Sequence, residues 1–171
     1  MKHLILNLSL FLVAFEQVPI DASALIEKNG IYYETDPRKT FTGTLVHYYE
    51  DGRVKERAGY QNGTREGLRE TFHENGQLFE KENYKGGELN GLFQGFYDSG
   101  QLWWQGQAKN NLRNGLLQAF YANGQLKYQG QHKDNSQEGV WQYFDEDGSL
   151  SETRCYLDNV QVELSSCRRT E

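Results

Sequence analysis

The sequence lacks the short motifs that mark the common catalytic and ligand-binding sites. No G-x-S-x-G nucleophile elbow, P-loop, H-E-x-x-H zinc motif or complete calcium loop occurs in its 171 residues. Residues 145–148 (DEDG) begin like a calcium loop but lack the remaining ligands. We therefore expect a protein that is not an enzyme and that needs no metal or cofactor.

Basic residues are too few and too scattered to form a patch. The chain has 18 Lys and Arg against 24 Asp and Glu, a formal net charge of −6, and its only dense basic run is Arg168-Arg169. Nucleic acids and anionic lipids attract clusters of Lys and Arg. We therefore expect no nucleic-acid partner, and the sequence argues against binding to membrane lipid.

Only one long apolar stretch is present, at residues 4–15 (LILNLSLFLVAF). It follows Lys2 and precedes Ala22-Ser23-Ala24, the pattern of a secretory signal peptide with its cleavage site. It is shorter than the roughly 20 apolar residues of a membrane-spanning helix. We expect export to the periplasm, the cell envelope or the medium after cleavage near Ala24. An uncleaved anchor and an apolar first strand are the alternatives, and no cysteine nearby supports a lipoprotein.

What the chain has in abundance is a repeat of 24 residues. Two series of glycines keep this spacing without a slip. They are Gly43, Gly67, Gly91, Gly115 and Gly139, and Gly52, Gly76, Gly100, Gly124 and Gly148. A period of 20 to 50 residues is typical of stacked supersecondary units that bury a face only against their neighbours.

Each unit reads as one β-hairpin. Two apolar and aromatic runs of strand length are separated by turns such as Glu74-Asn75-Gly76 and Ala122-Asn123-Gly124. Asn or Asp followed by Gly supplies the positive φ of a tight connection. The runs are too short for helices, so five units predict about ten antiparallel strands.

Apolar residues recur at fixed positions, counted from the first glycine of each unit. Position 2 holds Thr44, Leu68, Leu92, Leu116 and Val140, and position 6 holds Tyr48, Phe72, Phe96, Phe120 and Phe144. Position 12 holds Val54, Leu78, Leu102, Leu126 and Leu150. Positions 2 and 6 share one face of a strand, so we expect these columns to be the buried face. The predicted fold is all-β, an elongated single-layer antiparallel β-meander of stacked hairpins.

The pattern G-[LV]-x3-[FY]-x3-G-x-[LV] resembles the MORN repeat, in the bacterial variant form known as YwqK-like antitoxins. The resemblance covers the five repeats at 43–162. With the signal peptide at residues 1–24, the predicted division of the chain adds an N-terminal cap half-repeat at 25–42 and a C-terminal tail at 163–171. The repeats are 43–66, 67–90, 91–114, 115–138 and 139–162. The resemblance also implies a protein or peptide partner, for instance a toxin-like protein.

The two cysteines lie close together in the sequence, Cys155 in the last repeat and Cys167 in the tail. In an exported protein they are expected to form a disulfide that holds the terminal strand on the stack. Two unrelated thiols are the alternative. A metal site on this pair is disfavoured because no histidine lies nearby.

The remaining polar columns do not suggest catalysis. His47, His73 and His132 occupy different repeat positions. Glu56 and Glu80 share position 14 with Glu152, which we interpret as a solvated strand position and not as a paired acid and base.

The face opposite the expected core is also aromatic, most densely in the third repeat. Positions 3, 7 and 13 place Phe93, Tyr97 and Trp103 there, with Trp104 on the other side. The predicted partner-binding residues are Phe79, Phe93, Tyr97, Trp103, Trp104, Tyr121 and Trp141. Such rings can anchor an extended peptide. The alternative is that they merely stack along the sheet and shield its hydrogen bonds.

Two functions remain open from the sequence. One is a binding module with an antitoxin-like, immunity-like or scaffold role at the cell envelope. The other is a structural envelope protein that acts as a spacer without a specific ligand. Export argues against a cytosolic antitoxin, and the oligomeric state stays open.

Overall fold

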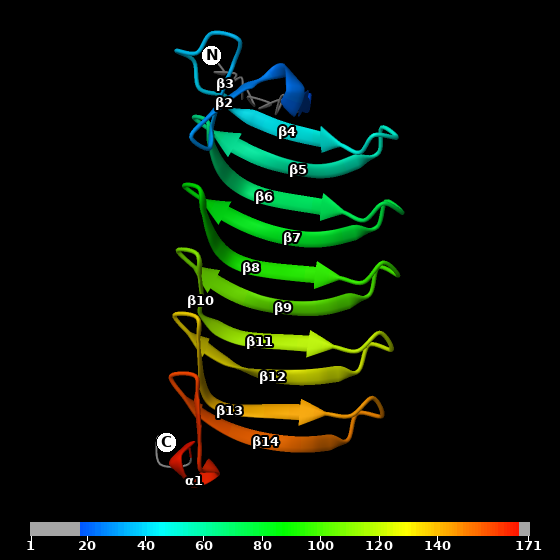
Figure 1. The fold of residues 1–171 in the computed structure, drawn as a ribbon, viewed down its shortest axis with the longest axis vertical. Coiled ribbons are helices and arrows are strands. Elements are labelled where there is room, and N and C mark those ends of the chain that lie inside the picture. Colours follow the sequence, from blue (N-terminus) through cyan, green and yellow to red (C-terminus); the bar gives the residue numbers. More distant parts are fainter. Residues whose placement is uncertain (1–17, 168–171) are drawn as a thin grey trace, which may run out of the picture.

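A computed structural model describes residues 18–167, and it shows one tall, curved, single-layer sheet built from successive hairpins (Figure 1). The predicted all-β meander is confirmed. Most of the predicted signal peptide, residues 1–17, lies outside the described part of the chain. Its predicted cleavage site lies inside the described part, where Ala22–Ala24 form a short 3-10 turn, η1, beside the first repeat.

The strands and helices are as follows. The N-terminal elements are β1 (Ile20–Asp21), η1 (Ala22–Ala24), β2 (Ile26–Lys28) and β3 (Ile31–Tyr33). The repeats contain β4 (Gly43–Tyr48), β5 (Val54–Gln61), β6 (Thr64–Phe72), β7 (Leu78–Lys85), β8 (Glu88–Phe96), β9 (Leu102–Lys109), β10 (Leu112–Arg113), β11 (Gly115–Phe120), β12 (Leu126–Lys133), β13 (Ser136–Phe144) and β14 (Leu150–Leu157). The chain ends with β15 (Val160–Val162) and α1 (Leu164–Cys167).

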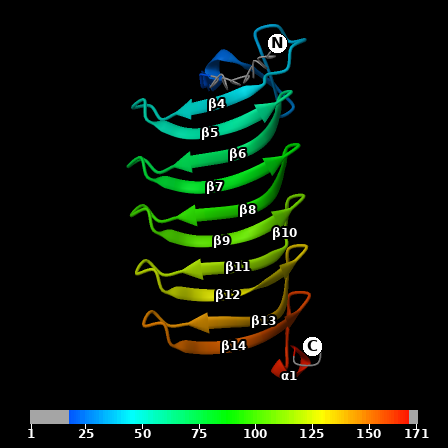
Figure 2. The same ribbon diagram turned by 180° about the vertical axis from the view of Figure 1, so that it is seen from behind.

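Neighbours in the main sheet follow the order of the chain. The path runs from β4 to β15 through antiparallel pairs, with β10 paired beside β9, and β1 joins the other edge of β4 as a parallel strand. Strands β2 and β3 form a separate small sheet at the N-terminal end. Seen from behind, the same ladder of hairpins is unbroken (Figure 2).

The two edges of the ladder carry different turns. On one edge, which we call the short-turn edge, consecutive residues such as Asn110 and Asn111 both have positive φ, as a two-residue type I′ hairpin requires. On the other, the long-turn edge, Gly100 has a φ of +85° and donates its N–H to the Tyr97 carbonyl. These long turns are the ones that the sequence predicts at residues 74–76 and 122–124.

A β-bulge follows each long turn and re-aims the strand after it. In the third repeat Gly95 is opposite Trp104, but Phe96 is opposite Leu102, so Trp103 has no partner on β8. The same shift occurs in the other four repeats. Position 13 is therefore the extra residue, and position 14 lies on the face of positions 3 and 5.

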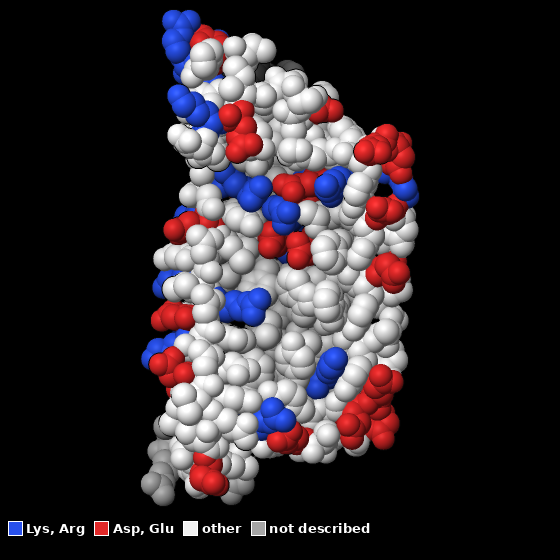
Figure 3. All heavy atoms as spheres, in the orientation of Figure 1, with Lys and Arg blue, Asp and Glu red and all other residues white. Residues whose placement is uncertain are grey.

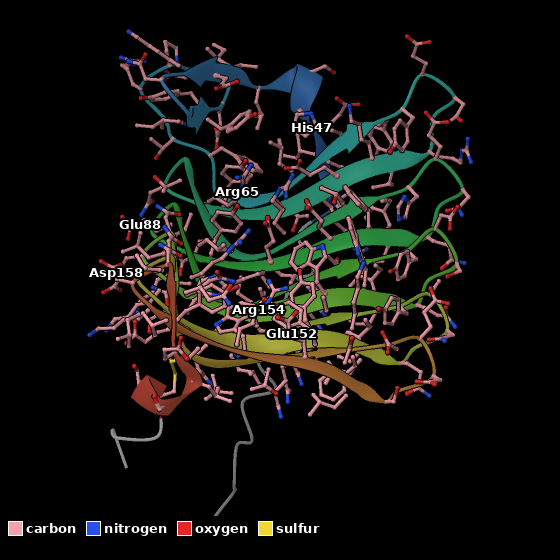
Figure 4. The ribbon with its side chains drawn as sticks, turned by 60° about the horizontal axis from the view of Figure 1, so that its bottom comes forward. His47, Arg65, Glu88, Glu152, Arg154 and Asp158 are labelled. Atoms are coloured by element: carbon pink, nitrogen blue, oxygen red, sulfur yellow. A yellow bond between two sulfur atoms is a disulfide. The ribbon has the colours of Figure 1, made fainter. Side chains whose placement is uncertain are left out.

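The predicted buried face is wrong. Position 2 is exposed, with Leu68 at 38% and Leu92 at 37%, whereas Phe93 and Trp141 at position 3 are 4% and 2% exposed. The buried column lies on the concave side, where Figure 4 shows His47, Arg65, Glu152 and Arg154. The columns expected to be the core lie on the convex side.

Glycines inside the strands explain how the concave rings become buried without a second layer. A Cβ on Gly130 would lie 2.1 Å from the Trp141 ring, and one on Gly106 would lie 2.6 Å from Phe93. A Cβ on Gly95 would lie 2.3 Å from Trp104. Each ring therefore lies against the backbone of an adjacent strand, a place that only glycine leaves open. Trp104 shares this concave face with Phe93, which corrects the prediction that it lies opposite.

The convex face carries a row of hydrogen-bonded glutamines. Side-chain amides donate in one direction from Gln94 to Gln105, Gln118, Gln129 and Gln142, at N···O distances of 2.9 to 3.3 Å. The same row continues toward the N-terminus as the ion pair of Arg57 and Glu70. Two of these bonds lie within a hairpin and two join consecutive hairpins, so the row links the third, fourth and fifth repeats across the convex face.

Both ends of the sheet are partly covered. At the N-terminal end Phe41, Leu45, Ala58 and Tyr60 form a buried cluster that Ala22, Leu25 and Tyr32 pack against. At the C-terminal end the structure contains the expected disulfide between Cys155 and Cys167, which anchors α1 to β14. By closing a loop of this size, the disulfide lowers the entropy of the unfolded chain and stabilises the folded protein by roughly 3 kcal/mol. These elements shorten the open edges, since β1 pairs with Leu45 and Val46 of β4 and β15 pairs with Cys155 to Leu157 of β14.

Position 7 supplies a hydrogen bond between successive repeats. The Tyr97 hydroxyl donates to the Phe120 carbonyl at 2.8 Å, and the Tyr121 hydroxyl donates to the Phe144 carbonyl at 2.8 Å. The equivalent Tyr49 bonds to Phe72, and His73 lies 3.0 Å from the Phe96 carbonyl. These side chains hold each long turn against the next.

Substituting Tyr121 with Phe should remove one of these bonds and leave the Phe144 carbonyl with one partner fewer. We expect Tyr121→Phe to lower the free energy of unfolding by about 1 kcal/mol, measured by urea denaturation. Tyr48→Phe is the matched control, because Tyr48 is 45% exposed and its hydroxyl makes no hydrogen bond within residues 18–167. Equal effects of the two substitutions would contradict the proposed role of position 7.

Candidate functional site

The seven predicted binding residues do not lie on one surface. Phe93, Trp104 and Trp141 lie on the concave face by their strand register. Phe79, Tyr97 and Trp103 gather at the long-turn edge, where they line one hollow. Tyr121 lies on the same edge, one repeat further along.

The hollow at the long-turn edge spans the second and third repeats and has a volume of about 330 Å³. Its lining residues are His73, Phe79, Phe96, Tyr97, Asp98 and Trp103. Two ring pairs form its walls: His73 and Phe79 have centroids 4.7 Å apart, and Tyr97 and Trp103 have centroids 5.7 Å apart. We call this site the edge hollow.

Trp103 is the most accessible large ring in the edge hollow, with 41% of its surface exposed. The bulge causes this exposure, because Trp103 is the extra residue of β9 and has no cross-strand partner to cover it. An exposed tryptophan beside other rings is the kind of surface that anchors protein partners.

Acidic groups surround the edge hollow. Asp98 lines it and has no ion-pair partner in the part of the chain that the structure describes. Figure 3 shows acidic atoms at several of the long turns along this edge. The acidic residues of these turns are Glu50, Asp51, Glu74, Asp98, Asp145, Glu146 and Asp147, and the only basic residue in them is Arg53. Arg53 is already paired with Asp51.

The concave aromatic residues are more deeply placed. Phe93 and Trp104 have centroids 5.5 Å apart, and Trp141 contacts the rings of His132 at 5.1 Å and Tyr156 at 6.2 Å. A hollow of about 360 Å³ lies beside them, lined in part by Arg113. Phe93 and Trp141 are buried, which favours the alternative that these two rings stack along the sheet over the prediction that they bind a partner.

A network of ion pairs on the concave face escaped the sequence analysis. Arg69 binds Glu56 at 2.9 Å and Glu82 at 2.7 Å, and Arg65 lies 3.4 Å from Glu56. The prediction of a solvated column at position 14 is therefore wrong for Glu56, whose side chain is only 18% exposed. Figure 3 shows these mixed charges near the middle of the upper half of this face. The signal was Arg69 at position 3, where the other repeats carry apolar residues.

Burial changes the titration of groups on the concave face. Burial, together with the nearby charge of Glu82, raises the pKa of Glu80. Burial also lowers the pKa of His132, which is 8% exposed and lies near Arg113. Its Nδ1 atom has no hydrogen-bond partner within residues 18–167.

Two kinds of site are not found among residues 18–167. No cluster of three or more His, Cys, Asp or Glu side chains is suited to hold a metal ion there. The only helices in this range are short, and none is long and apolar enough to cross a membrane.

The lowered pKa of His132 predicts a dependence of stability on pH. Below about pH 6.5 the unfolded imidazole binds a proton more readily than the folded one, so stability falls as the pH falls. His132→Tyr installs the residue that Tyr60, Tyr84 and Tyr156 provide at this position and removes the titrating group. We expect this variant to lose less unfolding free energy than the wild type between pH 7.5 and 5, measured by urea denaturation. If both proteins lost the same unfolding free energy, the pH dependence would not come from His132.

Comparison with known proteins identifies the repeat. The profile of the MORN repeat variant family matches residues 41–62, 65–85, 113–134 and 137–158, just over half of the chain. The unmatched segment between the second and third matches contains Phe93, Trp103 and Trp104. No curated protein matches the sequence.

Solved structures show only a weak likeness. A mutant of S. aureus TarM in complex with Fondaparinux, alpha-GlcNAc-glycerol and UDP is 11% identical, with a TM-score of 0.38 over 56% of this chain and 19% of that one. Another TarM structure is 12% identical, with a TM-score of 0.38 over 57% and 19%. The GtfA/B complex bound to UDP and GlcNAc is 11% identical, with a TM-score of 0.28 over 85% and 26%. The chain thus spans about a fifth to a quarter of these proteins, and these scores carry no functional argument.

The four matched segments coincide with four of the five stacked hairpins: β4 and β5, β6 and β7, β11 and β12, and β13 and β14. The chain therefore belongs to the MORN repeat variant family.

Proposed function

We propose that this repeat scaffold is a non-enzymatic binding module whose edge hollow docks a protein or peptide partner. The observation that carries the proposal is the exposed Trp103 ring, held beside Tyr97 and Phe79 in one open hollow. Rings of this kind are enriched at the centres of protein interfaces. Four of its six lining residues come from the third repeat, which the family profile does not match, and this supports a role particular to this chain.

The disulfide indicates a location outside the cytoplasm, because disulfides persist in oxidising compartments. We further propose that the chain is exported and works at the cell envelope, in the periplasm or outside the cell. An immunity-like or scaffold role is consistent with that location. A role as antitoxin against a cytosolic toxin is less so, because the target would be in another compartment.

The rigid attachment of the hollow also supports docking. Tyr97 is fixed by its bond to the Phe120 carbonyl, and Asn75 of the preceding turn donates to the Asp98 carbonyl at 2.7 Å. A site whose side chains are fixed beforehand loses less conformational entropy when a partner binds.

An affinity purification with the full chain as bait tests the proposal. The bait is exposed to an envelope extract of the source organism, and recovered proteins are quantified by mass spectrometry. We expect Trp103→Ala to reduce recovery of the partner by about tenfold, because the substitution removes a central aromatic anchor. Lys127→Ala, at the same position of the fourth repeat, is the matched control and should leave recovery unchanged. Equal recovery by all three baits would contradict the proposal and favour a spacer without a ligand.

A further inference from the structure

The repeats offer an internal comparison of what the long-turn edge accepts. Positions 7 and 13 meet there in the first four repeats. In the first repeat the Lys55 ammonium lies over the Tyr49 ring, 5.7 Å from its centroid. In the fourth, the Lys127 ammonium lies over the Tyr121 ring at 5.3 Å. In these repeats the chain places its own cation on the aromatic ring of position 7.

In the second and third repeats an aromatic ring replaces the lysine at this edge. Position 13 is Phe79 in one and Trp103 in the other, and each packs beside the ring of position 7. Among residues 18–167, no Lys or Arg side chain lies over any of these four rings. The rings instead border the edge hollow.

Charge at the edge hollow matches a cation. Asp98 lies in its wall with no ion-pair partner in the described range, and the long-turn edge around it is acidic (Figure 3). A carboxylate next to the faces of Tyr and Trp rings favours an ammonium or guanidinium over a neutral or acidic group. Electrostatic attraction to the acidic edge would also speed the approach of a basic partner.

We propose that the edge hollow binds a cationic side chain, lysine or arginine, of the protein partner. The cation lies in the hollow against the exposed ring of Trp103, which fills at position 13 the place that Lys55 and Lys127 hold in their own repeats, and Asp98 is its counter-ion. This inference rests on the proposed function of the hollow and names the chemistry that it recognises.

Fluorine NMR of the full chain labelled with 5-fluorotryptophan tests this directly. The label reports separately on Trp103, Trp104 and Trp141. The probe is N-acetyl-lysine methylamide at low salt, and the matched probe is N-acetylnorleucine methylamide, which keeps the four-carbon stem without the charge. We expect the lysine compound to shift the Trp103 resonance saturably, with little change at Trp141, and the norleucine compound to shift it much less.

Two charge variants sharpen the test. Asp98→Asn should weaken binding of the lysine compound by about threefold, because the counter-ion is lost. Glu146→Gln is the matched control, since Glu146 occupies the equivalent turn position of the fifth repeat and does not line the hollow. It should leave the affinity within a factor of about two. Equal shifts from both probes, or equal weakening by both variants, would overturn the inference.

Failure of this inference and failure of the proposed function give different results. If Trp103→Ala abolishes capture of the partner while the lysine compound does not bind, the docking site stands and its cation preference falls. If the lysine compound binds at Trp103 but partner capture does not depend on Trp103, the cation site stands and the proposed docking function falls.

Discussion

Hydrogen bonding between the edges of consecutive hairpins is the interaction on which the rest of this molecule depends. A single-layer sheet has no second layer to cover its faces, so each hairpin must be stabilised by the hairpins above and below it. Main-chain pairs such as Lys81 with Gln94, and Gln129 with Gln142, join one repeat to the next. The side chains add to this pairing in three places: concave rings, convex glutamines and the tyrosines of position 7.

Each of these three kinds of contact includes examples that join consecutive hairpins. Trp141 of β13 lies over Gly130 of β12, and the Tyr121 hydroxyl reaches the Phe144 carbonyl of the following repeat. The amide of Gln105 donates to Gln118 across the junction of β9 and β11. Stability is therefore distributed along the whole length of the ladder, and the ends need their own protection. The N-terminal cluster and the C-terminal disulfide supply it.

The same construction sets where recognition is possible. Rings that pack against a glycine of the adjacent strand, such as Phe93, are buried in the sheet and are not available to a partner. The bulged position is different, because its residue has no partner across the strand and can vary without breaking the ladder. Lysine occupies it in the first and fourth repeats, and rings occupy it in the second and third. A surface position that is free to vary inside a rigid repeat is well suited to carry specificity.

Most of the fold was predictable from the sequence because the glycine spacing fixes both the hairpins and their order. The buried face was not, because alternation separates the two faces without saying which is buried, and Gly95, Gly106 and Gly130 were given no weight. The bulge was also ignored, which placed Trp104 on the wrong face. Glycine in a strand interior marks the close approach of a ring, and that signal was available.

The candidate site was predictable only in part. Tyr97, Trp103 and Phe79 were found as exposed aromatic positions, and they meet in one hollow. Phe93 and Trp141 were grouped with them because a column of rings looks the same whether it is buried or open. The ion pairs of Arg69 could not be read from Glu56 alone, since a lone column of glutamates does not show which strand brings its counter-charge.

Amide hydrogen exchange measured residue by residue by NMR tests the central claim most directly. In β8, β9, β11 and β12, some amides face the partner strand of the same hairpin and others face the adjacent hairpin. If consecutive hairpins are joined through their edges, both sets should be protected to a similar degree, within about tenfold. Strong protection inside hairpins with exchange near the unprotected rate between them would contradict the account.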